Sequence, residues 1–174
     1  LGLSGTLTGL AIAISVVWDA ISDPIVGAWS DKLRSRWGRR HPFMVASVVP
    51  MALSFVVLFA PPQFALQSQN SLFLWLLGSV LLLRTALTFF MIPYLALGAE
   101  MTADYHERTH LASARTNLGW FAGVAVAAGA MFMLFADTQG QDGRFVMQNY
   151  HHYGWLNAVG VLIFSLICLR GTWH

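Results

Sequence analysis

The sequence predicts an all-α membrane protein, a polytopic bundle of about five transmembrane helices. Apolar residues make up 56% of the chain and charged residues only 10%, whereas soluble domains carry about 25% charged residues. The apolar residues also fall in long continuous runs rather than in amphipathic stripes. Only helices and closed barrels satisfy their backbone polar groups in lipid, and runs this long exclude the alternating strands of a barrel.

Five apolar runs define the predicted spans, and each is close to the ~20 residues that cross a hydrocarbon core. The second run ends at a Pro61-Pro62 pair, and the third is long enough to cross the membrane with a tilt. The predicted spans are residues 6–30, 43–60, 72–98, 113–136 and 153–169. We interpret residues 1–174 as one helix bundle without an internal domain boundary.

The basic residues predict the orientation of the bundle. Most of them follow the first, third and fifth spans, whereas only Arg144 lies on the opposite side and Arg84 lies within a span. Because Lys and Arg are retained on the cytoplasmic side of a membrane, the ends of these three spans are predicted to face the cytoplasm. The basic residues on that side are Lys32, Arg34, Arg36, Arg39, Arg40, Arg108, Arg115 and Arg170.

Three ionisable residues lie inside predicted spans: Asp19, Asp23 and Arg84. A charge in lipid is costly, so each of them is a candidate functional group. Asp19 and Asp23 are four residues apart and therefore share a helix face, with Ser22 beside it. Pro24 has no amide hydrogen and so leaves the carbonyl of the residue four positions earlier free. These oxygens either form a cage for a small hard cation or share a proton, because neighbouring carboxylates raise one another's pKa.

The third span places a second set of side chains at helical spacing: Arg84, Thr88 and Met91. A rise of 1.5 Å per residue places Asp23 and Met91 at similar depth, and Arg84 about 10 Å further from the cytoplasm. Arg84 is therefore expected near Asp19 across the bundle. This pair either tunes the carboxylate site or is a structural ion pair that holds two helices together.

The loop after the first span carries a recognisable motif. Gly27 is followed four residues later by Asp31, and a basic run ends in Gly38, Arg39 and Arg40. This GxxxD and RxGRR-like pattern resembles the loop signature of the major facilitator superfamily. The stretches WDAISDPIVG, SRWGRRHPF and IPYLALGAEMTADYHERTHLASAR are more specific. They resemble the glycoside–pentoside–hexuronide:cation symporter family, the melibiose permease-like branch of that superfamily.

The resemblance implies a partial major facilitator fold in which the five spans match helices two to six. The first helix and the second half of the family fold would then be absent from this chain. It also implies three groups of functional residues. The cation-binding or proton-coupling set is Asp19, Ser22, Asp23 and Thr88; the substrate-binding set is Arg84, Arg115 and Tyr94. A cytoplasmic latch comprises Gly27, Asp31, Arg36, Gly38, Arg39, Arg40, Glu100 and Arg108.

One position departs from the family pattern. Met91 stands where the melibiose permease has an acid, and a thioether is a poor ligand for sodium. Sodium and protons therefore both remain open as the coupling ion.

The predicted function is cation-coupled symport of a sugar or glycoside by alternating access, in a multi-pass protein of the inner (plasma) membrane. The alternatives are a transporter of another solute, such as a lysolipid, and a non-transporting membrane fragment or assembly partner. The spans contain no catalytic or metal-ligand set, so we expect no enzyme and no cofactor other than the coupling ion. The expected partners are the sugar, the monovalent cation and the lipid bilayer, and not a nucleic acid.

Overall fold

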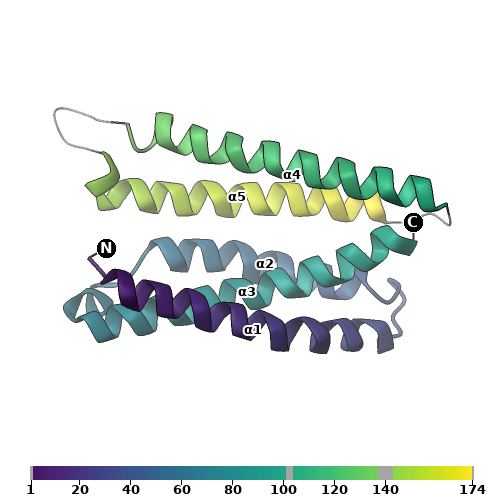
Figure 1. The fold of residues 1–174 in the computed structure, drawn as a ribbon, viewed down its shortest axis with the longest axis horizontal. Helices are drawn as coiled ribbons and strands as arrows, with labels where there is room; N and C mark the ends of the chain where they lie inside the picture. Colours follow the sequence, from purple (N-terminus) through teal and green to yellow (C-terminus); the bar gives the residue numbers. More distant parts are fainter. Residues whose placement is uncertain (1, 101–103, 137–142, 174) are drawn as a thin grey trace.

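The computed structural model describes residues 2–100, 104–136 and 143–173, and within these residues the protein is entirely helical. The five long helices are each long and apolar enough to cross a membrane, which confirms the predicted number of spans. Figure 1 shows them running along the longest axis of the molecule. They are α1 (Gly5–Lys32), α2 (His41–Phe59), α3 (Gln69–Glu100), α4 (Tyr105–Met133) and α5 (Met147–Thr172), with short 3-10 helices at Gln63–Gln67 and Gly143–Phe145.

Two helices begin earlier than their apolar runs. Helix α4 begins at Tyr105 rather than at residue 113, and α5 begins at Met147 rather than at residue 153. The start of α4 is capped by Asp104, whose Oδ1 accepts a hydrogen bond from the backbone N–H of His106 at 2.7 Å. The first turns of α4 and α5 are therefore polar and extend beyond the hydrocarbon layer. A prediction from runs of apolar residues cannot detect such turns.

Helix α2 lies at the centre of the packing. It contacts α3 on one side and α5 on the other, and α1 packs against α3. The core between these helices is apolar and includes the fully buried Met44, around which half-buried side chains such as Leu83 and Val161 pack. The other buried members of this core are Val48, Met51, Ala86, Phe90 and Leu169.

Hydrogen bonds at the two ends of the bundle show how the helices alternate in direction. At one end, the side chain of Gln69 accepts from the backbone N–H of Ser4 at 3.1 Å and donates to the carbonyl of Gly2 at 2.7 Å. At the other end, the side chain of His41 contacts the carbonyl of Thr172 at 3.0 Å. The ends of α1, α3 and α5 therefore share the side that the basic residues predict to be cytoplasmic, as Figure 1 also shows.

Helix α4 is the least buried element. None of its residues is buried, and a Cβ added at Gly119 or Gly123 would meet nothing within 4 Å. A cavity of about 430 Å³ separates it from α5 and is lined by side chains of both helices, including Met133 and Phe164. The apolar faces of α4 are thus not covered by the other described helices.

Candidate functional site

Helices α1 and α3 bring four polar side chains together inside the membrane-spanning region. The guanidinium of Arg84 donates a hydrogen bond to Oδ2 of Asp19 and forms an ion pair with it. One turn further along both helices, the hydroxyl of Thr88 donates to Oδ1 of Asp23 at 2.9 Å. The four-residue spacing on each helix is what aligns the two contacts. The depth in the membrane that was estimated from the helical rise per residue therefore correctly placed Arg84 opposite Asp19.

A third contact supports this pairing from the neighbouring positions. The indole Nε1 of Trp18 donates to the hydroxyl of Thr85 at 2.9 Å, and that hydroxyl in turn donates to the carbonyl of Leu81 at 2.7 Å. Trp18 and Thr85 adjoin Asp19 and Arg84 in sequence, so the three side-chain contacts fix the register of α1 against α3.

The two carboxylates between α1 and α3 have only part of their hydrogen-bonding capacity and charge matched by described residues. Oδ1 of Asp19 is buried and, among the described residues, has no hydrogen-bond partner. Asp23 is half-buried and forms no ion pair with a described residue. Two carboxylates and one guanidinium leave one net negative charge between α1 and α3. A buried charge and an unpaired acceptor are costly, so this site favours a cation or a hydrogen-bond donor.

Ser22, the fourth member of the predicted cation site, and Met91 lie beside these contacts. Ser22 is buried on the same helix, but its hydroxyl is directed to the backbone carbonyl of Asp19 at 3.5 Å rather than to a carboxylate. Met91 is 41% exposed and lies on α3 close to the depth of Asp23. The structure therefore brings Asp19, Asp23 and Thr88 together through side-chain contacts, with the buried Ser22 one residue before Asp23 on the same helix.

The predicted substrate residues are divided between two places. Tyr94 and Arg115 line one cavity of about 480 Å³, formed by the end of α3, the start of α4 and the end of α5. The ring of Tyr94 is stacked on Phe90 with centroids 6.2 Å apart, which leaves it part of the helix packing as well. Arg84 does not line this cavity, because it lies ten residues before Tyr94 on α3, and its guanidinium is bound to Asp19 instead.

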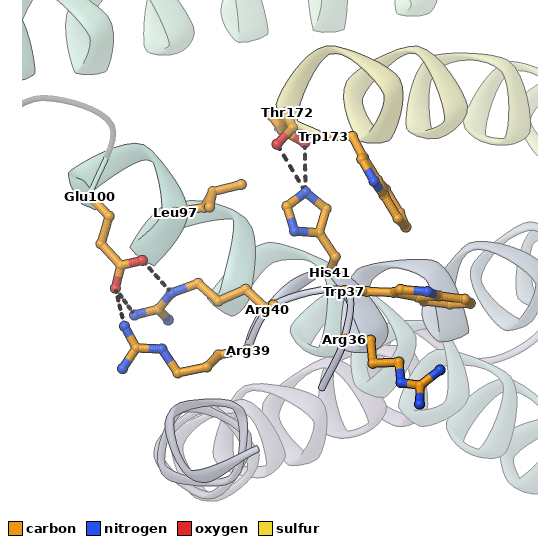
Figure 2. A pocket seen from close by; sticks show the side chains of 10 residues that line it. Arg36, Trp37, Arg39, Arg40, His41, Leu97, Glu100, Thr172 and Trp173 are labelled. Atoms are coloured by element: carbon orange, nitrogen blue, oxygen red, sulfur yellow. Dashed lines mark hydrogen bonds and ion pairs between the residues drawn. The ribbon is translucent and has the colours of Figure 1, made fainter. Parts of the chain in front are cut away.

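The cytoplasmic latch is an ion-pair network between the loop after α1 and the end of α3. Figure 2 shows Arg39 and Arg40 directed toward Glu100. The guanidinium of Arg40 donates to Glu100 from Nη2 at 2.6 Å and from Nε at 3.3 Å, while its Nη1 lies 3.2 Å from Asp31. Arg39 lies 3.7 Å from the same Glu100. Arg40 thus joins the end of α1 to the end of α3.

The electrostatics of the latch keep Arg40 charged. The hydrogen bond to Glu100 is the main cause that raises the pKa of Arg40 above its ordinary value, with the nearby charges of Glu100 and Asp31 acting in the same direction. A raised pKa means that the charged form stabilises the folded state at every pH below the ordinary arginine pKa. Arg40 therefore carries its full positive charge in the latch across the physiological pH range.

The two glycines of the motif differ in their roles. Gly38 has a φ of +81°, in the left-handed region that favours glycine, and its N–H donates to the carbonyl of Ser35 at 3.1 Å in the turn before α2. Gly27 faces α3, where a Cβ added to it would lie 3.6 Å from the side chain of Ile92, an ordinary van der Waals distance.

One arginine assigned to the latch lies outside the ion pairs that the described residues form. Arg36 lines a cavity of about 430 Å³ beside the latch, but in the described part of the chain it forms no ion pair. Arg108 lies on α4 and lines the cavity that contains Tyr94 and Arg115. Among the described residues, the ion pairs of the latch join Asp31, Arg39, Arg40 and Glu100.

Sequence reasoning missed a contact between the start of α2 and the end of α5. His41 is buried, its Nε2 lies 3.0 Å from the carbonyl of Thr172, and its ring lies 5.1 Å from that of Trp173 (Figure 2). Trp37 packs against the same indole at 5.7 Å. The only available signal was a histidine and tryptophans at predicted membrane interfaces, and this does not identify partners far apart in the sequence.

Comparison with known proteins supports this description. A family model described as MFS/sugar transport protein matches residues 1–173. An uncharacterized symporter of Synechocystis is 38% identical over 117 residues, which are 66% of this chain and 22% of that protein. The provisionally named glycoside/cation symporter YagG of Escherichia coli is 32% identical over 141 residues, 81% of this chain and 30% of the relative.

A further relative differs in the solute that its name states. The sodium-dependent lysophosphatidylcholine symporter 1 of Xenopus tropicalis is 34% identical over 93 residues, 53% of this chain and 17% of that protein. The chain therefore matches less than a third of the length of each of these three relatives.

In the described residues, five helices are long and apolar enough to span a membrane. Together with the matching transporter relatives, they define the molecule as a multi-pass membrane protein, which in bacteria lies in the inner membrane. The chain belongs to the MFS/sugar transport protein family. This confirms its resemblance to the glycoside–pentoside–hexuronide:cation symporters of the major facilitator superfamily.

Proposed function

We propose that the protein is a secondary active symporter that moves a sugar or glycoside together with a monovalent cation, by alternating access. The observation that carries this proposal is the acidic cluster between α1 and α3, with one net negative charge and an unpartnered carboxylate oxygen in a membrane-spanning region. Charges persist inside membranes mainly where they serve ion or solute pathways. Family membership favours transport over catalysis.

The cluster has the chemistry that coupling requires. One proton or one Na⁺ would neutralise its remaining charge, and Asp23 offers a carboxylate that no described cation balances. Binding of the cation then lowers the cost of rearranging α1 and α3. Coupling is reciprocal, so the solute would strengthen cation binding by the same factor.

The cavity between α3, α4 and α5 supports the solute side of the proposal. Arg115 offers several hydrogen-bond donors for sugar hydroxyls, and Tyr94 offers an aromatic face. The cavity opens at the end of the bundle where the latch lies. In this scheme, the latch stabilises one of the two facings of the transporter by holding α1 and α3 together at their ends.

The test is uptake of a panel of glycosides into cells that express the complete natural reading frame, with external pH recorded in the presence and absence of sodium. Asp23→Asn removes the uncompensated charge and is expected to abolish coupled uptake. Thr109→Val, at an exposed position of α4 whose hydroxyl donates to the carbonyl of Tyr105 in the same helix, is the control and is expected to retain it. Coupled uptake that persists in Asp23→Asn at normal expression would refute the assigned cation site.

A lysolipid is the second candidate solute, because the Xenopus relative is named for lysophosphatidylcholine transport. The two arginines of the cavity also suit a phosphate group. Labelled lysophosphatidylcholine added to the same cells separates the candidates: uptake of this lipid without uptake of any glycoside would replace the sugar proposal. Transport of neither solute by a well-expressed protein would favour a non-transporting assembly partner.

A further inference from the structure

The ion pair between Arg84 and Asp19 bears directly on which ion the site accepts. Arg84 lies in the middle of α3, its guanidinium is bound to Oδ2 of Asp19, and the two side chains are 39% and 22% exposed. An arginine stays protonated in proteins, so this positive charge is permanent. The negative charge of Asp19 is therefore already balanced by a cation that belongs to the chain.

The oxygens that remain form a poor site for sodium. Sodium prefers oxygen ligands, and Met91 contributes only sulfur to the neighbouring face of α3. Thr88 donates its hydroxyl hydrogen to Asp23 and Ser22 donates to a backbone carbonyl, so their oxygens remain as neutral ligands and do not offset the positive charge of Arg84. A sodium ion on the free Oδ1 of Asp19 would lie one carboxylate group away from a guanidinium on Oδ2. Like charges at this separation repel strongly outside bulk water.

The unpartnered oxygen of Asp19 fits a different ligand. Oδ1 is buried and accepts no hydrogen bond from any described residue. A neutral donor, such as water or a sugar hydroxyl, satisfies this oxygen without adding a charge beside Arg84. At Oδ1 of Asp19 the arrangement thus favours a bound hydroxyl over a bound metal ion.

From these contacts we infer that Arg84 is an ion-selectivity residue: its guanidinium takes the place of a metal cation at Asp19 and makes the protein independent of sodium. This inference rests on the proposed transport function. The property that it predicts, the affinity for sodium, can be measured without measuring transport. The competing explanation is that the pair only holds α1 and α3 together.

Binding of radioactive sodium to the purified protein, expressed from its complete natural reading frame, tests the inference. Wild type is expected to show no saturable binding. Arg84→Gln is expected to show saturable sodium binding, with an affinity at least ~10-fold above the detection limit for wild type, because one positive charge a few ångströms away is worth more than a factor of ten at an effective dielectric constant of about 20. Arg84→Lys keeps the charge and is expected to match wild type. Adding Asp19→Asn to Arg84→Gln is expected to remove the gained binding.

A second measurement keeps the inference testable if Arg84→Gln, which leaves Asp19 unpaired, is too unstable for the binding assay. The unfolding temperature of Arg84→Gln is expected to rise when sodium chloride replaces choline chloride, whereas that of wild type is expected to be the same in both salts. A merely structural ion pair predicts equal destabilisation of Arg84→Gln in both salts, and this result would overturn the inference. Saturable sodium binding by wild type would overturn it as well.

Glycoside uptake separates this inference from the proposed function. Sugar uptake by Arg84→Gln is expected to become stimulated by sodium. If neither wild type nor any variant carries sugar, the proposed function is wrong. If Arg84→Gln nevertheless gains sodium binding, the role inferred for Arg84 still holds.

Discussion

Arg40 joins two helix ends through the latch, so its removal should lower the stability of the bundle in a measurable way. Arg40→Met removes the guanidinium and keeps an apolar side chain of similar length. The guanidinium makes two hydrogen bonds to Glu100, at 2.6 and 3.3 Å, and one contact to Asp31 at 3.2 Å. The side chain of Arg40 is only 11% exposed, so water replaces these contacts poorly.

The size of the effect can be estimated from the same geometry. A hydrogen bond to a charged group contributes about 1.5–3 kcal/mol when it is shielded from water. The partners are 45% and 60% exposed, and exposed ion pairs contribute only about 0–1 kcal/mol. We therefore expect a loss of about 2 kcal/mol in the free energy of unfolding. For a chain of this size that corresponds to roughly 5 °C in the unfolding temperature.

Thermal unfolding in detergent micelles measures this effect. Arg36→Met is the matched control, since Arg36 lies in the same loop without an ion pair to a described residue, and its effect should stay within about 0.5 kcal/mol. In a double-mutant cycle, Arg40→Met and Glu100→Gln should couple by about 1 kcal/mol, and salt at about 1 M should reduce this coupling. Equal shifts for Arg40→Met and Arg36→Met would show that the latch contacts do not stabilise the fold.

Two further predictions concern glycines and use the same unfolding measurement. Gly38→Ala should cost about 1 kcal/mol because it places a Cβ in the left-handed region, whereas Gly27→Ala should be tolerated; the reverse order would refute the backbone argument. Gly154→Ala should cost roughly 1–3 kcal/mol, since its Cβ would lie 3.0 Å from the side chain of Phe59 on α2. Gly160→Ala on the same helix has open space and should be neutral; similar losses for the two would mean that α2 and α5 are not tightly packed at that point.

Much of the fold could be predicted because lipid imposes simple rules. The cost of exposed backbone and charge in a membrane fixes the length of each apolar run and the side of each arginine. A helix that begins outside the lipid follows no such rule. The start of α4 at Tyr105 could therefore be located only from the structure, which shows the cap at Asp104. The opposition of Asp19 and Arg84 followed from depth alone, since two tilted helices of known rise leave few alternatives.

The details of the site needed the structure because they depend on rotation and on distant contacts. Ser22 is one residue from Asp23, but each residue turns a helix by about 100°, and its hydroxyl is therefore directed away from the carboxylates. The choice of Arg40 over its neighbours as the central latch residue depends on the turn at Gly38. The contact of His41 with Thr172 joins residues 131 positions apart, and no local pattern encodes it.

The ion pair of Arg84 also constrains how the chain is inserted during synthesis. An arginine at the centre of a single spanning helix raises the free energy of membrane insertion by roughly 2.5–3.5 kcal/mol. Its partner Asp19 lies on α1, and the whole of α2 separates the two in the sequence. Pairing offsets this cost only after α1, α2 and α3 have all been synthesised. The ion pair therefore favours a close association of α1 with α3 from the moment that α3 enters the membrane.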